Sequence, residues 1–234
     1  MANSKSKSTA KVKKTANEQK KLSSSTDLKL SKSHGNNLAT SVVKALPYLL
    51  IITALIGMVA SFALTYDKIQ VLKDANYQPS CNINPILSCG SVMETEQASL
   101  LGVPNTIFGL VAFSMLFAFG FLLAGGAKVK RWIWIGAQLV ATMGVIFMHY
   151  LFFQGVFRIN AICPWCFVVW MITIPTFWYI TIYNLQTGNI KLPGKFSSLS
   201  IFIQKRHGDI LLVWYLIIFG ILLTHFWYYW STLI

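Results

Sequence analysis

Charged residues are scarce in this chain. Asp, Glu, Lys and Arg together make up 12% of its 234 residues, whereas hydrophobic residues make up 55% and the mean hydropathy is +0.56. A water-soluble domain carries about 25% charged residues. The deficit argues against a soluble globular protein and predicts that most of the chain lies in a membrane.

The sequence also lacks the motifs that bind common redox cofactors. It contains no dinucleotide fingerprint, no glycine-rich phosphate loop and no Cys-x-x-Cys-His haem attachment site. Cysteine itself is rare, and the four present are Cys81, Cys89, Cys163 and Cys166. They form two pairs, each at the edge of a long apolar segment. This arrangement suggests that electrons pass from one dithiol to the other.

Five long apolar segments are present, and each can span a bilayer. A hydrocarbon core of ~30 Å needs ~20 helical residues at a rise of ~1.5 Å per residue. The alternative, a soluble all-helical protein with buried helices, conflicts with this length, because core helices are seldom apolar over so many residues. We predict an all-α integral membrane protein with spans at about 45–66, 106–127, 132–153, 163–183 and 210–231.

The basic residues gather at the N-terminus. Residues 1–44 contain ten of the twenty Lys and Arg residues, opposed only by Glu18 and Asp27. No aromatic residue interleaves with these lysines, which argues against nucleic-acid binding. The rest of the segment is mostly Ser, Thr, Asn and Ala, a composition that cannot bury enough apolar surface to fold. We predict a disordered cytoplasmic tail that is attracted to anionic membrane lipid.

The distribution of positive charge predicts the orientation. With a cytoplasmic N-terminus, the inside segments are 1–44, 128–131 and 184–209, and they hold seventeen of the twenty Lys and Arg residues. The positive-inside rule favours this arrangement. We therefore predict a multi-pass protein of the cell membrane. All four cysteines then lie on the extracytoplasmic side, where disulfides persist.

The second pair of cysteines belongs to the sequence Cys163-Pro-Trp-Cys166, at the predicted start of the fourth span. Proline suits the first turn of a helix, because its missing N–H would be unpaired there. Positions i and i+3 share a helix face, and the helix N-terminus stabilises a thiolate. We interpret the pair as a redox-active dithiol. A zinc site and two inert buried thiols are the alternatives, although zinc needs four converging ligands.

The first pair, Cys81-x7-Cys89, lies in a segment rich in Asn, Pro, Ser and Gly. Such a composition is typical of a turn-rich loop. A mobile dithiol could exchange with a soluble partner and then with the pair at the membrane edge. A structural disulfide that fixes the loop is the alternative. A chain of thiol exchanges also needs a final acceptor, and a lipophilic quinone, menaquinone or ubiquinone, suits a site within a membrane.

Together these features resemble the vitamin K epoxide reductase family and its bacterial homologues over about residues 45–185. The resemblance is carried by the two cysteine pairs, by a hydroxyl residue six positions after Cys89, and by Pro-Asn-Thr-Ile-Phe-Gly at 104–109. It implies a four-helix transmembrane bundle around a quinone, with the Cys-x-x-Cys at its tip. With the predicted spans, the chain then divides into the tail 1–44, the bundle 45–185 with extracytoplasmic loop 66–105, a cytoplasmic loop 186–209 and a fifth transmembrane helix 210–234.

The resemblance implies a role for each cysteine. Cys163 and Cys166 match the active-site pair, in which Cys166 is the sulfur that meets the quinone. Cys81 and Cys89 match a shuttle pair that passes electrons from a thioredoxin-fold protein to Cys163.

The resemblance also implies residues around the quinone. Thr95 matches a position that is commonly serine, and its hydroxyl would shape the loop or the redox site. Asn105 matches the asparagine that hydrogen-bonds a quinone oxygen, and Phe108 would pack on the quinone. Trp170 stands where vertebrate members have a tyrosine, so the quinone contact at this position differs. No metal site is predicted.

Bacterial members often carry a fused thioredoxin-like domain after a fifth span, and this sequence shows none. We therefore expect a separate extracytoplasmic, DsbA-like partner. The predicted function is that of a membrane thiol:quinone oxidoreductase that drives disulfide formation in exported proteins. Two alternatives remain open: reduction of quinone or quinone epoxide as the main role, and a non-enzymatic metal-holding membrane scaffold.

Four other residues within the spans bear on packing or proton transfer. Gln138 is predicted to form hydrogen bonds between helices. Gly57 and Ser61, four residues apart, are predicted to allow close helix packing. His149 lies near the depth of the thiols, where we weigh a satisfied interfacial histidine against a proton relay to the quinone.

Overall fold

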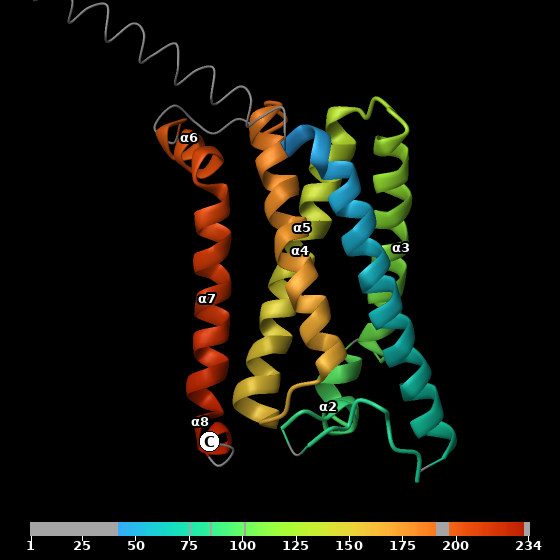
Figure 1. The fold of residues 1–234 in the computed structure, drawn as a ribbon. Helices are drawn as coiled ribbons and strands as arrows, with labels where there is room; N and C mark the ends of the chain where they lie inside the picture. Colours follow the sequence, from blue (N-terminus) through green and yellow to red (C-terminus); the bar gives the residue numbers. More distant parts are fainter. Residues whose placement is uncertain (1–41, 75, 85, 101, 191–196, 232–234) are drawn as a thin grey trace, which may run out of the picture. The chain divides into compact units, whose positions relative to one another are not determined.

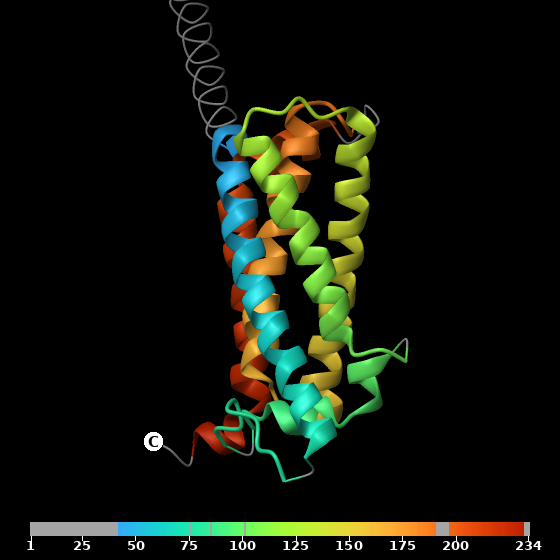
Figure 2. The ribbon, with the colours of Figure 1, turned by 90° about the vertical axis from the view of Figure 1, so that its right-hand side faces the viewer.

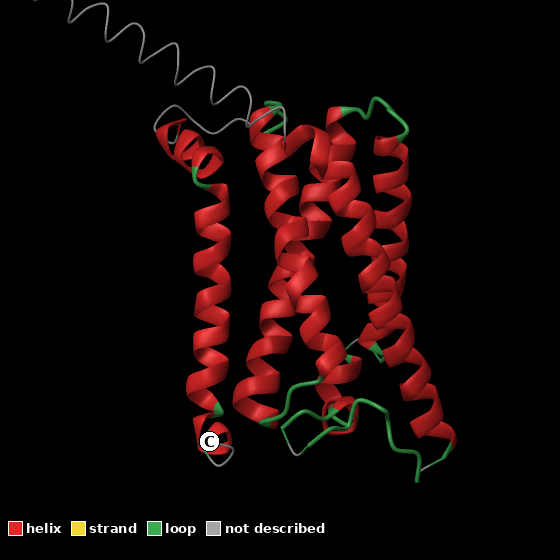
Figure 3. Cartoon of the chain, in the orientation of Figure 1, coloured by secondary structure: helices red, strands yellow, loops and turns green. Residues whose placement is uncertain are grey.

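The computed structural model describes residues 42–74, 76–84, 86–100, 102–190 and 197–231. The predicted tail 1–44 lies almost entirely outside these ranges. Within them, the secondary structure is helical apart from one isolated β-bridge, and Figure 3 shows helices joined by loops. The prediction of an all-α protein is confirmed.

Within the described ranges, five helices are long and apolar enough to cross a membrane, as predicted (Figure 1). The most apolar 18-residue stretch of each helix has a mean hydropathy between 1.6 and 2.4. In chain order the five helical segments are Val42–Lys73, α3 (Asn105–Ala124), Arg131–Ile159, α5 (Pro164–Gln186) and α7 (His207–His225).

The first helix extends well beyond its predicted end at residue 66. It continues to Lys73 because polar residues such as Asp67 and Lys68 maintain helical hydrogen bonding after the apolar stretch has ended. This extension matters for the site, since Asp67 is buried and Lys68 donates a hydrogen bond to the carbonyl oxygen of Met93 (2.7 Å).

The third membrane segment changes helix type before it ends. Helix α4 spans Arg131–Gln154 and continues as a π-helical turn, η2, over Gly155–Ile159. Asn160 then adopts a left-handed conformation with φ of 55°, which ends the helix. A short extended segment leads from there into α5, whose first residue is Pro164. The chain thus reverses within a few residues and places α4 against α5.

The loop between the first helix and α3 contains two short helices, α2 (Cys89–Met93) and η1 (Glu96–Ser99). Leu87 forms a parallel β-bridge with Ile162. The Ile162 N–H donates to the carbonyl oxygen of Ile86 (2.7 Å), and the Ser88 N–H donates to the carbonyl oxygen of Ile162 (3.1 Å). Figures 1 and 2 show these loop elements at the end of the bundle where α5 begins.

Polar side chains join the helices at the other end of the bundle. The Gln138 amide donates to the hydroxyl of Thr181 (2.9 Å), and the Asn184 amide donates to the Gln138 side-chain oxygen (3.1 Å). The interhelical role predicted for Gln138 is confirmed. A paired amide avoids the free-energy penalty of an unsatisfied polar group in hydrocarbon.

Helix α7 is attached to the bundle by hydrogen bonds at several depths. The Trp214 indole donates to Nε2 of His149 (3.1 Å), while Nδ1 of His149 lies 2.7 Å from the carbonyl oxygen of Val145. At the end nearer the loop, His225 Nε2 lies 2.9 Å from the side-chain oxygen of Asn160. Both ring nitrogens of His149 therefore have partners, which favours the interfacial-histidine interpretation over the proton relay.

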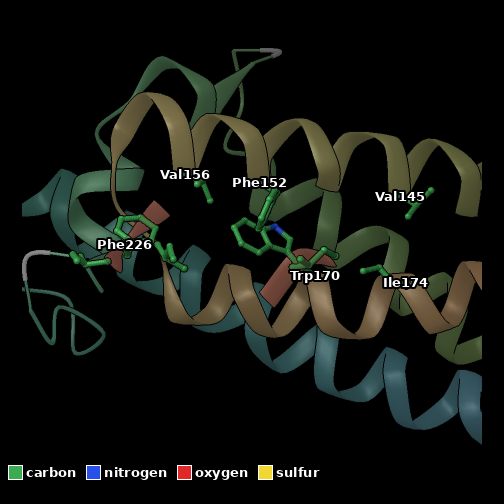
Figure 4. Close-up of a cluster of buried hydrophobic side chains, with 9 residues drawn as sticks. Val145, Phe152, Val156, Trp170, Ile174 and Phe226 are labelled. Atoms are coloured by element: carbon green, nitrogen blue, oxygen red, sulfur yellow. The ribbon is translucent and has the colours of Figure 1, made fainter. Parts of the chain in front are cut away.

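An apolar core joins α4, α5 and α7. Figure 4 shows Phe152 of α4 and Trp170 of α5 pointing toward each other, with ring centroids 4.9 Å apart. The buried members of this cluster are Ile86, Val145, Phe152, Val156, Ile162, Trp170, Ile174, Ile218 and Phe226. Because Ile86 and Ile162 belong to it, the core also holds the loop.

Gly57 marks the closest approach of the first helix to α3. A Cβ at this position would lie 2.5 Å from the Phe113 ring, so Gly57→Ala forces the two helices apart. We expect a loss of about 1–3 kcal/mol of stability, the usual range for overpacking, measured as a lower thermal unfolding temperature in detergent. Gly136→Ala is the matched control, because its Cβ meets no atom within 4 Å. Equal stability of the two variants would contradict the close packing.

Candidate redox active site

The fourth span begins at the Cys-x-x-Cys, as predicted. Cys163 is the N-cap of α5, and its sulfur accepts a hydrogen bond from the Cys166 N–H (3.4 Å). Pro164 occupies the first helical position, where no N–H is needed. Cys163 is buried, with 2% of its surface exposed, and Cys166 is partly buried. Both are free thiols.

The two loop cysteines form a disulfide, Cys81–Cys89, with Cα atoms 5.6 Å apart. Cys89 is the first residue of α2, after the N-cap Ser88. The loop is less open than its composition predicts, because Cys89 is fully buried and only 6% of Cys81 is exposed. The backbone bonds to Ile162 account for this burial by holding the loop against the start of α5.

The two cysteine pairs meet in space although they lie far apart in sequence. The Cys163 sulfur lies 3.2 Å from the Cys89 sulfur, across a separation of 74 residues. Both belong to a buried cluster completed by Leu64, Cys81 and Met93. A thiol in van der Waals contact with a disulfide sulfur can exchange with it directly. The arrangement therefore connects the loop disulfide to the dithiol of α5.

A cavity opens beside these sulfurs inside the bundle. It contains about 860 Å³ of space unfilled by protein atoms, including space open to the surroundings. Its lining is almost entirely apolar, as the linings of small-molecule sites mostly are. The lining comes from the first helix, the loop, α3, α4 and α5, and the predicted site residues within it are Thr95, Asn105, Cys163, Cys166 and Trp170.

Two of the lining residues also hold the loop in shape. The Thr95 hydroxyl donates to the carbonyl oxygen of Val92 (2.8 Å). The Asn105 amide donates to the carbonyl oxygen of Gln97 (2.6 Å), and its side-chain oxygen accepts the Leu100 N–H (3.3 Å). Asn105 thus links the start of α3 to η1. Its NH₂ group has a second hydrogen available for a ligand.

Trp170 presents a buried donor that the protein does not use. Only 5% of the residue is exposed, and among the described residues its indole Nε1 has no hydrogen-bond partner. An unsatisfied buried donor costs about 1–3 kcal/mol. Since Trp170 also lines the cavity, a ligand with a carbonyl oxygen could satisfy this N–H. The apolar lining of the cavity and this free donor both fit a quinone.

Not every residue predicted for the site is found there. Phe108 is 44% exposed and does not line the cavity. His149 lines a second, smaller space together with Trp170. Among the residues that the structure describes, no group of three or more His, Cys, Asp and Glu side chains is placed to hold a metal ion.

Sequence reasoning missed Asp67, which lies next to the loop disulfide. Its position falls within the predicted extracytoplasmic loop 66–105, yet only 5% of it is exposed. Its Oδ1 accepts the Tyr77 hydroxyl (2.9 Å), and its Oδ2 lies 3.7 Å from the Cys81 sulfur. The available signal was helical spacing: Asp67 follows Leu64 by three residues, and Leu64 packs on the cysteines.

The environment of Cys163 favours its thiolate. A hydrogen bond from the Cys166 thiol is the main cause that lowers the pKa of Cys163, and the backbone N–H groups of Cys166 and Trp165 act in the same direction. Burial and the charge of Asp67 oppose this shift. A thiol in contact with a disulfide, beside an apolar cavity in a bundle of membrane-length helices, is an arrangement typical of a membrane oxidoreductase.

The comparison with known families agrees with this class. The model of the vitamin K epoxide reductase family matches residues 48–181, more than half of the chain. The chain belongs to the vitamin K epoxide reductase family. No curated protein sequence matches it significantly.

The pKa of Cys163 can be tested with two replacements of Cys166. Cys166→Ser keeps a side-chain donor, whereas Cys166→Ala removes the largest cause of the shift. We expect the Cys163 thiolate, followed by its ultraviolet absorbance with the loop disulfide intact, to persist to lower pH in the Ser variant. As pH falls through the lowered pKa, the Cys163 thiolate is protonated and thiol–disulfide exchange slows. The same titration midpoint in both variants would contradict the assignment.

Proposed function

We propose that this protein is a membrane thiol:quinone oxidoreductase. It oxidises an extracytoplasmic thioredoxin-fold, DsbA-like partner, transfers the electrons to menaquinone or ubiquinone, and so drives disulfide formation in exported proteins. The observation that carries the proposal is the 3.2 Å contact between Cys89 and Cys163, beside a cavity that Cys166 lines. Family membership supports the quinone acceptor.

The relay follows the order of the sulfurs. A partner thiolate attacks Cys81, the more exposed loop sulfur, and releases Cys89. Cys89 then attacks Cys163 of an oxidised Cys163–Cys166 pair, which releases Cys166 as a thiolate at the cavity. The second thiol of the partner attacks the partner–Cys81 disulfide, which releases the oxidised partner and frees Cys81. Cys81 then attacks Cys89 of the Cys89–Cys163 disulfide, and Cys163 leaves and becomes a thiol again. The product of this last step is the state described here, with the loop disulfide closed and both α5 thiols free.

The residues of the cavity provide the site for the acceptor. Quinone supplies the capacity to take up two electrons and two protons. The indole N–H of Trp170 and the free amide hydrogen of Asn105 can each donate to a carbonyl oxygen, and the apolar lining excludes water. Phe108 remains a proposed packing residue, although in this state its side chain lies outside the cavity.

The orientation is part of the proposal. The charge pattern of the segments between the five spans supports a cytoplasmic N-terminus and, with it, an extracytoplasmic position for the four cysteines. This is the compartment in which a thioredoxin-fold oxidant and its disulfides persist. Labelling of Cys163 from the cytoplasm alone would contradict this orientation.

The family's description favours a second candidate, reduction of quinone epoxide. The same cysteines and cavity serve either substrate, so an assay of the purified protein with a quinone and with its epoxide separates the two functions. A metal-holding scaffold is distinguished by elemental analysis: a stoichiometric bound metal, with thiols that quinone does not oxidise, would favour it.

The order of attack in the loop predicts where a partner is trapped. In Cys89→Ala, Cys81 is a free thiol that can attack the disulfide of an oxidised partner. No Cys89 thiolate is then present to displace the partner, so we expect adducts with extracytoplasmic proteins to accumulate on Cys81. Acid quenching, alkylation and non-reducing electrophoresis with peptide mapping would detect them. Cys81→Ala is the matched control and should give few adducts, because Cys89 is fully buried. Predominant adducts on Cys89 would reverse the proposed order.

The unused donor of Trp170 predicts a binding defect. Trp170→Phe keeps an aromatic ring but removes the N–H, so we expect the KM for quinone to rise about 2- to 10-fold, which corresponds to one hydrogen bond of about 0.5–1.5 kcal/mol. Steady-state kinetics with a soluble quinone would measure it. Trp132→Phe, at a residue that is 70% exposed, is the control. An unchanged KM in Trp170→Phe would remove the indole from the quinone site.

A further inference from the structure

A buried carboxylate lies against the loop disulfide, and the proposed thiol relay assigns no role to it. Asp67 comes from the extended end of the first helix, with one oxygen 3.7 Å from the Cys81 sulfur. A disulfide sulfur has no proton, so in this state it donates nothing to the carboxylate. Once the Cys81–Cys89 bond opens, the thiol of Cys81 faces an acceptor at hydrogen-bonding range.

The carboxylate is oriented by a second contact. The Tyr77 hydroxyl donates to Oδ1 of Asp67 (2.9 Å), which leaves Oδ2 directed at the sulfur. The same hydrogen bond is the main cause that raises the pKa of Tyr77. The phenol thus fixes the orientation of the carboxylate, with its second oxygen placed toward the sulfur whose proton it would take up.

Other groups near Asp67 do not neutralise it. The titratable groups that face it within the described residues are the Tyr77 phenol, Cys81 and, at longer range, Cys163. The adjacent cation, Lys68, is directed to the carbonyl oxygen of Met93. The carboxylate therefore acts on the sulfurs rather than on an ion-pair partner.

We propose that Asp67 is a catalytic residue that accepts the proton of Cys81 when Cys81 attacks Cys89 and closes the loop disulfide. The inference rests on the proposed relay and adds to it the base for its last step. Without a base, the Cys81 thiol would have to lose its proton to water before it could attack. A thiol with the ordinary pKa of ~8.5 is only about 1% thiolate at a pH near 6.5.

The step balances within the chain. The bond between Cys81 and Cys89 forms, and the bond between Cys89 and Cys163 breaks. The electron pair of the broken bond goes to Cys163, which leaves as the thiolate that its surroundings favour. The proton of Cys81 goes to Asp67. In reverse, the protonated Asp67 returns the proton to Cys81 as the loop disulfide opens.

The test follows the closing of the loop in a single turnover. The full-length protein is reduced at all four cysteines, freed of reductant without oxygen, and mixed with a soluble quinone. Samples are quenched with acid, alkylated, and mapped by mass spectrometry for each disulfide. In Asp67→Asn the Cys89–Cys163 disulfide should accumulate, because closure is about 30- to 100-fold slower near pH 6.5.

The dependence on pH separates a base from a structural role. Near pH 9 an ordinary thiol is mostly ionised without help, so closure in Asp67→Asn should come within about 3-fold of the natural rate. Asp67→Glu should restore most of the rate near pH 6.5. Asp74→Asn is the matched control, since Asp74 is exposed and its carboxylate accepts only a local backbone N–H. Closure at the natural rate near pH 6.5 in Asp67→Asn would overturn the proposal.

A second measurement needs no variant, in case Asp67→Asn does not assemble the site. Closure in the natural protein should be slower in D₂O, because a proton moves as the sulfur attacks. Closure that is not slowed would indicate attack by a preformed thiolate and would overturn the role of Asp67. Failure of the relay itself looks different: quinone would then produce no Cys89–Cys163 or Cys81–Cys89 disulfide even in the natural protein.

Discussion

The proposed relay depends on one contact, that between the sulfurs of Cys89 and Cys163. Two backbone hydrogen bonds maintain it, one from Ile162 to Ile86 and one from Ser88 to Ile162, just before α5 begins. The membrane-spanning helices supply rigid walls, but these few bonds set the register between a loop and a helix that are 74 residues apart in sequence. Without these bonds, the loop backbone would not hold the disulfide against Cys163, and the disulfide would only join two parts of the loop.

Much of the fold could be predicted from the sequence, because the bilayer constrains it strongly. Apolar length specified the five spans, and Cys163-Pro164 specified the start of α5. The predicted helix ends were less accurate, because they were set where the apolar stretch stops. The first helix continues to Lys73, since backbone hydrogen bonds of a helix form equally well through polar residues such as Asp and Lys. Where the sequence alone favoured a mobile loop between Cys81 and Cys89, tertiary hydrogen bonds bury both sulfurs.

The site was predictable in its chemistry but not in its geometry. The cysteine pairs and the resemblance pointed to Thr95, Asn105 and Trp170, and these residues line the cavity. Phe108 shows the limit of carrying over a motif, since the helix phase at the start of α3 turns its ring outward in this state. Asp67 shows another limit, because a carboxylate becomes significant only when tertiary structure brings a sulfur within reach.

The left-handed residue that ends η2 has a consequence for the last helix. Asn160 is the one non-glycine residue with positive φ in the part of the chain that the structure describes, a conformation that costs roughly 1–2 kcal/mol for most side chains. Its side chain is held by His225 at the end of α7. The C-terminal helix thereby braces the bend that leads to Cys163, so a segment that contributes no reactive atom helps to set the distance between the two sulfurs of the proposed exchange.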